Sequence, residues 1–249
     1  QDTNSEYIKS FDSDGITLGS DANLNGNNVT YVGWSWKGGG TVAAGNNTDG
    51  TITTTVSANP TAGFSVIKYT SNGTSGATIG HGLGNAPAFF IVKNIDATDH
   101  YAVYHQSLGN GKALLLNSSN TPYTDTAFWN DTSPTNTVIT LGNETSTNTS
   151  DGDDYICWAW AEVEGYSKFG SYTGNGSTDG VFIYTGFKVA WWLVKRTDST
   201  EYWYLRDPTS DDTHPIRITL NPTSRYVKSS YGSSDILTHR IKIRQSSTR

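Results

Sequence analysis

Two short acidic stretches have a spacing that could hold a calcium ion. "DSDG" at 12–15 places Asp12 and Asp14 at alternate positions, and "DGDD" at 151–154 does the same with Asp151 and Asp153. Calcium binds carboxylate and carbonyl oxygens from such loops, which a downstream glutamate usually completes. Neither stretch has that glutamate, and Asp-Gly is also common turn chemistry. Both stretches are therefore weak metal candidates, and no cofactor is predicted.

The other reactive side chains form no pattern typical of an enzyme. Glycoside hydrolysis needs two carboxylates about 5–10 Å apart across a cleft, whereas Glu162 and Glu164 are neighbours on one face of a predicted strand. The histidines lack metal-ligand spacing, and no G-x-S-x-G motif occurs. "GHGLG" at 80–84 precedes Pro87 and a strand rather than a helix, so it predicts a tight turn with glycines at positive φ. We expect no enzyme activity.

Aromatic residues near position 200 could bind a sugar instead. Trp192, Tyr202 and Trp203 could form a platform, because aromatic faces stack well on the CH groups of sugars. Adjacent Trp191 and Trp192 must point to opposite faces of a strand, so at least one of them is expected in the core. Binding of cell-surface glycans is therefore the alternative function.

Composition favours an all-β chain with almost no helix. Charged residues make up only 16% and there are 26 glycines, with Ser, Thr and Asn filling most of the gaps, a mixture typical of turns and strands. The net charge of −6 argues against a nucleic-acid partner. No apolar run suits a membrane span, so no membrane insertion is expected. Cys157 is the only cysteine, which excludes an intrachain disulfide and predicts a small buried side chain.

The chain contains a tandem repeat. "GFSVIKYTSN" at 63–72 matches "GYSKFGSYTGN" at 165–175 with one insertion, and "FFIVKNID" at 89–96 matches "WWLVKRTD" at 191–198 at an offset of 102 positions. Short alternating or solid apolar runs between Gly and Asn turns indicate antiparallel strands. The repeat predicts two tandem, jelly-roll-like β-sandwich modules.

These matches divide the chain into four parts. Residues 1–36 form an N-terminal strand segment and residues 37–62 a linker. Residues 63–160 are called module 1 and residues 161–249 module 2.

An aromatic motif closes module 1 but has no copy after module 2. Residues 138–160 read as strand, polar loop and the strand "YICWAW", and residues 15–36 have the same form, with "ITLG" before "YVGWSW". Module 2 ends in "HRIKIR", which is expected to correspond to "ITLG", and no aromatic strand follows Arg249. Module 2 is therefore predicted to lack its last strand.

A sheet that lacks a strand exposes unpaired backbone groups, which proteins normally cover. Residues 31–36 could close module 2 of the same chain, or they could enter module 2 of the next subunit by strand donation. Because donor and acceptor lie at opposite ends, donation would give a ring or an open filament. The predicted donor side chains are Tyr31, Trp34 and Trp36, with the two tryptophans as the buried plug. The predicted acceptor side chains are Ile241, Ile243, Arg240, Lys242 and Arg244.

The charges of the two ends fit either solution. Residues 1–36 carry five acidic side chains and one lysine, a net charge of −4, whereas residues 236–249 carry four cations and a net charge of +4. Complementary charge of this kind steers association. Solvated terminal charges without a partner are the alternative interpretation.

Several stretches together resemble a known module. "YVGWSWKGGG", "TAGFSVIKYT", "GHGLGNAPAFFIVKN", "AEVEGYSKFGSYTGNGSTDG" and "FIYTGF" followed by "WLVKRTDST" resemble a repeat module of large virion proteins of marine bacteriophages, often labelled tail-fibre or structural proteins. The resemblance covers residues 11–245 approximately. It implies a β-rich, extracellular, structural or adhesive module, and it offers no catalytic residues.

The sequence thus predicts a non-enzymatic structural subunit of an extracellular filament or phage virion, with its own copies as partners. The alternative is a carbohydrate-binding, receptor-recognising module of a phage tail fibre. The sequence also allows N-linked glycosylation, because it contains acceptor sequons. They lie at Asn28, Asn46, Asn72, Asn117, Asn130, Asn143, Asn148 and Asn175.

Overall fold

A computed structural model describes residues 6–39, 46–149, 152–208, 219–222 and 233–244. In these residues the chain is mostly β, with antiparallel sheets and one short helix, which confirms the fold class at that level. It divides into two compact units, Gln1–Trp36 and Lys37–Arg249, which are described separately.

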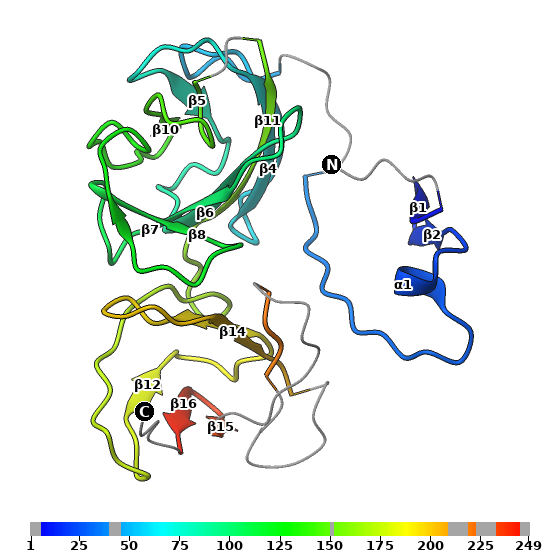
Figure 1. Ribbon diagram of the computed structural model, residues 1–249, viewed down its shortest axis with the longest axis vertical. Helices are drawn as coiled ribbons and strands as arrows, with labels where there is room; N and C mark the ends of the chain where they lie inside the picture. The colour runs from blue at the N-terminus through cyan, green and yellow to red at the C-terminus, as the bar shows by residue number, and fades with distance from the viewer. Residues whose placement is uncertain (1–5, 40–45, 150–151, 209–218, 223–232, 245–249) are drawn as a thin grey trace. The chain divides into compact units, whose positions relative to one another are not determined.

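Unit 1 is a small hairpin followed by one helical turn. Strand β1 (Ile8–Phe11) pairs with β2 (Ile16–Leu18), and the helix α1 (Ala22–Asn25) follows (Figure 1). Asp21 caps the helix, because its side chain accepts a hydrogen bond of 2.8 Å from the Asn23 amide. The described residues after α1 in this unit form no strand.

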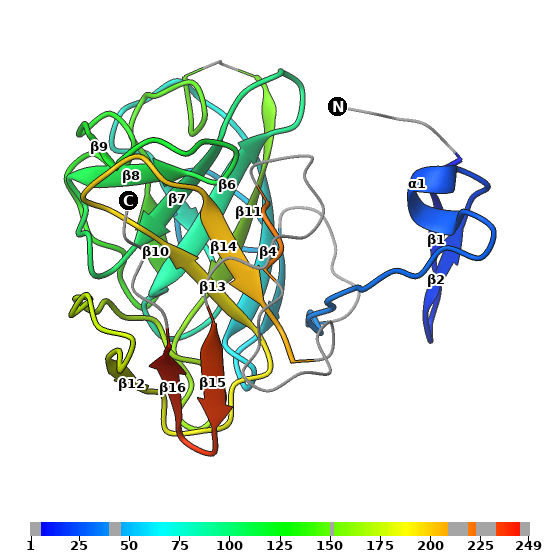
Figure 2. The ribbon, with the colours of Figure 1, turned by 60° about the horizontal axis from the view of Figure 1, so that its bottom comes forward.

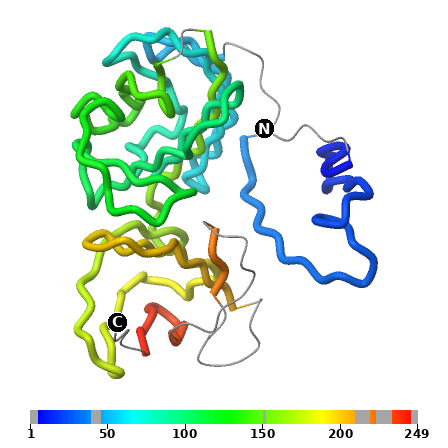
Figure 3. The backbone as a smooth tube through the Cα atoms, in the orientation of Figure 1, coloured from blue at the N-terminus to red at the C-terminus, as the bar shows by residue number. Residues whose placement is uncertain are grey.

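Unit 2 is built on a seven-stranded antiparallel sheet with the order β3-β4-β11-β6-β7-β8-β9. Its strands are β3 (Thr55–Asn59), β4 (Phe64–Thr70), β6 (Phe89–Asn94), β7 (Tyr101–His105), β8 (Lys112–Leu115), β9 (Tyr123–Thr124) and β11 (Asp154–Trp160). In Figure 3 these strands are coloured from cyan to green along the chain. β11, the last of them in the sequence, pairs between β4 and β6. Because β3 pairs with β4, this part of residues 37–62 belongs to the sheet, which corrects the prediction of a linker there.

A second layer covers one face of this sheet. Strand β5 (Thr78–Gly80) pairs with β10 (Val138–Thr140), and Ile79 and Ile139 lie in one core cluster with Phe90 and Tyr155 of the large sheet. Alternation explains the arrangement, because every second residue of β11 is fully or nearly fully buried. The turn between β5 and β6 has Gly82 and Gly84 at φ +68° and +74°, as "GHGLG" predicted.

Module 2 contributes two smaller sheets. Strands β12 (Phe182–Tyr184), β16 (Arg240–Ile243) and β15 (Ser234–Leu237) form one in that order, with β16 in the centre. Strands β13 (Trp192–Lys195) and β14 (Trp203–Arg206) form the other (Figure 2).

A shared apolar cluster joins module 2 to the large sheet. Trp203 of β14 packs in one cluster with Phe89 and Val103, and its indole Nε1 donates a hydrogen bond of 2.9 Å to the Leu115 carbonyl. Leu193 of β13 packs against the same cluster.

Candidate strand-acceptor site

The aromatic strand of module 1, β11, lies in the middle of the large sheet. It pairs with β4 from Asp154↔Thr70 to Trp160↔Phe64, and with β6 from Tyr155↔Asn94 to Trp160↔Phe89. Both of its edges are therefore hydrogen-bonded. Removing β11 would leave β4 and β6 as open edges and divide the sheet in two.

The two faces of β11 have different surroundings. Tyr155, Cys157 and Ala159 are fully buried in the main core. The Tyr155 ring stacks on that of Tyr69, with centroids 5.2 Å apart and 10° between the planes. The Tyr155 hydroxyl donates to the Thr145 carbonyl at 2.8 Å, so the polar end of this buried ring is satisfied. Burial raises the pKa of the Cys157 thiol well above its ordinary value, so this thiol stays protonated and unreactive.

The tryptophans of β11 lie on its other face. Trp158 and Trp160 are only half-buried. Trp160 packs against Phe64 and Phe89, with ring centroids 5.1 and 5.4 Å away. The tyrosine, rather than the tryptophan pair, is thus the fully buried aromatic residue of this motif in module 1.

Module 2 has counterparts for most elements around β11. At the offset of the repeat, β13 corresponds to β6 and β14 to β7, and both pairs are antiparallel hairpins. The β12–β16 pair occupies the same place in the repeat as the β5–β10 pair.

No strand occupies the place of β11 in the described part of module 2. Among the described residues, β13 pairs only with β14, so its second edge has no strand beside it. Residues 168–173, which make up most of the counterpart of β4, form no strand either. Tyr172, the counterpart of Tyr69, is 41% exposed, whereas Tyr69 is 2% exposed. Among the described residues, the candidate site is therefore the edge of β13 that has no strand beside it.

This position differs from the predicted acceptor. Strand β16 carries Ile241 and Ile243 but has β12 on one side and β15 on the other, so neither edge of it is open to a donor. Ile241 is buried and Ile243 packs with it in the small core of module 2. Ile241 and Ile243 therefore fill the interior, and the open edge belongs to β13. Sequence reasoning missed β13 because strand order in a sheet does not follow chain order.

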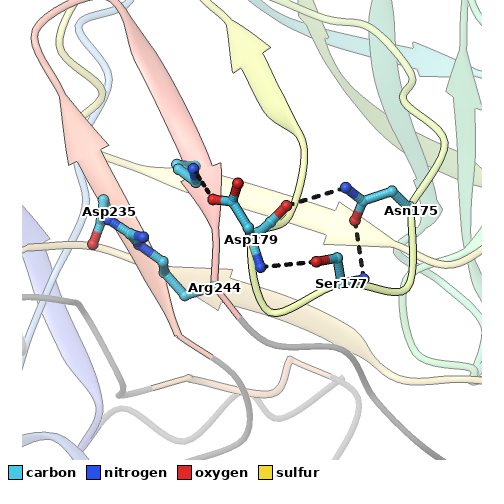
Figure 4. A network of polar contacts seen from close by, with 6 residues as sticks. Asn175, Ser177, Asp179, Asp235 and Arg244 are labelled. Atoms are coloured by element: carbon cyan, nitrogen blue, oxygen red, sulfur yellow. Dashed lines mark hydrogen bonds and ion pairs between the residues drawn. The ribbon is translucent and has the colours of Figure 1, made fainter.

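The basic side chains of the predicted acceptor are largely occupied within module 2. Lys242 forms an ion pair with Asp179, and Arg244 forms one of 2.5 Å with Asp235 (Figure 4). The hydrogen bond from Lys242 lowers the pKa of the Asp179 carboxyl. The Arg240 guanidinium lies 4.9 Å from the centre of the Phe182 ring. Internal pairing therefore reduces the charge that this end offers for steering.

The aromatic segment at 31–36 is mostly exposed. Tyr31 is 45%, Val32 47% and Trp34 38% exposed, whereas Trp36 is half-buried. The Tyr31 hydroxyl accepts from the Gly26 amide at 2.8 Å and donates to the Ala22 carbonyl at 2.7 Å, which holds the ring next to α1. Of the residues 6–36 that the structure describes in unit 1, only Gly19 is buried, so these residues form no apolar core of their own.

The predicted sugar platform does not form. Trp203 is only 4% exposed and bonds to the Leu115 carbonyl, so its ring is part of the core. Trp192 packs against the small core of module 2, and Tyr202 alone of the three is exposed. Only tertiary packing, which places β14 against the large sheet, decides that Trp203 faces inward.

The calcium residues that the structure describes join no cluster of metal ligands. Asp12 accepts a hydrogen bond of 2.7 Å from the Thr17 hydroxyl, which lowers the pKa of its carboxyl, and Asp14 is exposed nearby. Asp153 accepts one of 2.8 Å from Asn94, whereas Asp151 lies outside the described residues. Within the described ranges no group of three His, Cys, Asp or Glu side chains could hold a metal ion. No helix among them is long and apolar enough to cross a membrane.

Comparison with known proteins gives a family. A family model described as a domain of unknown function (DUF7483) matches residues 1–249. The chain belongs to this family. No curated protein and no solved structure matches the chain. Within this DUF7483 chain, the open β13 edge is the candidate site that the geometry supports best.

Proposed function

We propose that the chain is a non-enzymatic structural subunit that assembles head to tail by β-strand complementation. The observation that carries the proposal is the contrast between the two modules. The aromatic strand β11 is bonded on both edges in module 1, whereas the corresponding edge of β13 has no strand beside it among the described residues. Residues 31–36 repeat the sequence of β11 closely enough to take its place.

Exposed apolar surface in unit 1 supports the donor role. A solvated cluster of large apolar side chains usually marks an interaction surface. Burying such surface contributes about 25 cal/mol per Å² of apolar area, so covering even two of these rings favours association by several kcal/mol before entropy is counted. The exposed side chains include Phe11, Ile16, Val29, Tyr31, Val32 and Trp34.

The geometry of donation determines the product. Donor and acceptor are different surfaces of the same chain, so each subunit would use its residues 31–36 on one neighbour and its β13 edge on another. Contacts of this heterologous kind propagate into a filament or close into a ring. We propose two tandem β-sandwich modules as the repeating unit, placed on an extracellular fibre or a virion surface. The resemblance to phage virion modules supports that location, and glycosylation at the sequons is compatible with it.

The experiment compares the intact chain with a variant that lacks residues 1–36. Light scattering over a concentration series and negative-stain microscopy measure assembly, and circular dichroism checks that the variant keeps its β signal. We expect filaments or rings from the intact chain and monomers from the variant. A synthetic peptide of residues 29–37 should bind the variant, and a scrambled peptide should not. An intact chain that stays monomeric at high concentration would contradict the proposal.

Carbohydrate binding is the second candidate, and one observation favours it. Phe182 and Tyr184 of β12 are 52% and 74% exposed, and they line a pocket with Leu237, Thr238, His239 and Arg240. Exposed rings beside a cation suit an acidic sugar. A glycan array with the intact chain and the Tyr184→Ala variant tests it. Selective binding that the variant loses, by a protein that never polymerises, would favour this function over assembly.

A further inference from the structure

We infer that the donated strand enters the acceptor in one register, with Gly33 opposite Val194 and with Tyr31, Gly33 and Ser35 facing the core of module 2. This inference rests on the proposed function, because it names the partner segment and its fit at the same site. It differs from the prediction that Trp34 and Trp36 form the buried plug.

Module 1 gives the register directly. Cys157 pairs with Val92 of β6, and Ala159 pairs with Phe90. The motif "YICWAW" aligns with "YVGWSW", so Gly33 takes the place of Cys157 and Ser35 that of Ala159. The repeat places Val194 at the position of Val92 and Trp192 at that of Phe90. Gly33 therefore meets Val194, and Ser35 meets Trp192.

The sizes of these side chains compensate for each other. Module 2 has the larger Trp192 where module 1 has the fully buried Phe90. The donor has the smaller Gly33 where β11 has Cys157. Interiors are close-packed, so extra volume on one strand must be offset on its neighbour. In this register Gly33 lies diagonally across from Trp192 rather than directly opposite it. Diagonal neighbours are within reach of an aromatic ring, so Gly33 leaves room for the Trp192 side chain that Cys157 would fill.

The opposite edge of the donor has a partner as well. In module 1 β11 also bonds to β4, and the Tyr155 ring stacks on Tyr69. The corresponding pair would be Tyr31 with Tyr172, and in the structure both residues are more than 40% exposed. We expect the donor to draw residues 166–173 into a strand on its far side, so that one insertion forms two ladders.

Backbone bonding shows which positions can be cross-linked. The Ile95 amide donates to the Asp154 carbonyl, and the Gln106 amide donates to the Ala88 carbonyl, both at 2.9 Å. Alternation in an antiparallel ladder then directs odd-numbered amides of β6 to β11 and even-numbered ones to β7. The Cys157–Val92 pair is therefore a non-hydrogen-bonded pair. Such pairs have Cα atoms about 4.5 Å apart, within the range of a disulfide.

The test introduces paired cysteines into the full chain. The in-register variant carries Gly33→Cys and Val194→Cys, and the matched control carries Gly33→Cys and Arg196→Cys, which is displaced by two residues on the same face. After mild oxidation we expect a ladder of covalent multimers on a non-reducing gel from the first variant and none from the control. Native Cys157 is buried and unreactive, so it does not contribute.

The outcomes separate the register from the assembly itself. If both variants cross-link equally into multimers, the register is wrong and strand donation still stands. The same conclusion follows if neither variant cross-links while filaments still form. An internal disulfide within monomers of the first variant would keep the register but replace donation with closure in the same chain. If neither filaments nor cross-links form, the proposed function fails and the register fails with it.

Discussion

Strands β6 and β13 have nearly the same sequence pattern but different surroundings. β6 lies between β7 and β11, and Phe90 and Val92 on it are 1% and 0% exposed. β13 has only β14 beside it within the described residues, and each of its side chains is half-buried. The comparison teaches that an apolar run becomes a buried central strand only when both neighbouring strands are supplied.

The tyrosines next to these strands show the same difference. Tyr69 is buried, stacks on Tyr155, and donates a hydrogen bond of 2.5 Å to the Thr147 carbonyl. Tyr172 lies in a segment without a strand and is exposed. In the proposed assembly, module 2 would take up the arrangement that module 1 shows.

The largest expected effect on stability comes from replacing the first tyrosine of each aromatic motif, Tyr155 in β11 and Tyr31 in the segment 31–36, by alanine. Tyr155→Ala should lower the free energy of unfolding by about 3–5 kcal/mol, the usual cost of removing a large buried aromatic ring. Tyr31→Ala should leave the unfolding of unit 2 in the dilute monomer unchanged, because Tyr31 lies in unit 1 and its hydrogen bonds go to Gly26 and Ala22 of that unit, but it should weaken assembly. Urea denaturation at low concentration and light scattering at high concentration measure the two effects. Equal destabilisation of the monomer by both variants would break the comparison.

Proline in the donor should disrupt assembly without disturbing the monomer. Val32 corresponds to Ile156, which pairs with Lys93, so its amide should bond to the acceptor edge. Val32→Pro removes that donor and leaves a carbonyl without its partner, a cost of about 1–3 kcal/mol that weakens association about 5- to 150-fold. Val32→Thr keeps the amide and is the matched control. Sedimentation of both variants measures the difference, and similar weakening by the threonine variant would exclude backbone pairing as the cause.

A buried histidine should make the large sheet sensitive to acid. Burial lowers the pKa of His81, whose Nδ1 accepts from the Leu83 amide at 3.2 Å, so the neutral ring is the folded form. Because the pKa of His81 is lower in the folded state than in the unfolded state, the unfolded state binds more protons at pH values below the ordinary histidine pKa. Stability should therefore fall as the pH drops from the ordinary histidine pKa towards the lowered one. Melting temperatures of wild type and His81→Gln across this range test it, and parallel curves would contradict it.

The smallest effect concerns the ion pair at the start of β11. Lys68 lies 2.7 Å from Asp154, and both groups are partly exposed, so Lys68→Gln should cost about 0.2–1 kcal/mol. The Lys68 ammonium lowers the pKa of the Asp154 carboxyl. This contribution is present above the ordinary aspartate pKa and is lost as the pH falls through the lowered one. Urea denaturation at low and high salt measures it, and an effect that salt does not reduce would point to packing instead.

Much of this architecture could be predicted from the sequence, because alternation and turns are local. The repeat located strands at 64–70, 89–94, 154–160 and 192–195. The repeat could not show that residues 168–175 form no strand. A segment becomes a strand only when a neighbouring strand pairs with it, and the sequence indicates only that the segment is able to pair.

The candidate site was only partly predictable. The aromatic segment at 31–36 was recognised by its likeness to β11, whereas the predicted acceptor residues lie on β16, which has a strand on each side. Ile241 was predicted as an acceptor side chain, yet β12 and β15 bond to both sides of its strand. Nor does side-chain size show which face of β11 is inward, since the tryptophans are half-buried and Ala159 is fully buried.

Amide hydrogen exchange at single-residue resolution tests the central claim most directly. Ile91 of β6 and Leu193 of β13 occupy equivalent positions, and their amides should point to the β11 edge in each module. In the assembled protein we expect both amides to be protected. In Val32→Pro the Ile91 amide should stay protected while that of Leu193 exchanges rapidly. Equal protection of Leu193 in the intact chain and the variant would contradict strand donation to this edge.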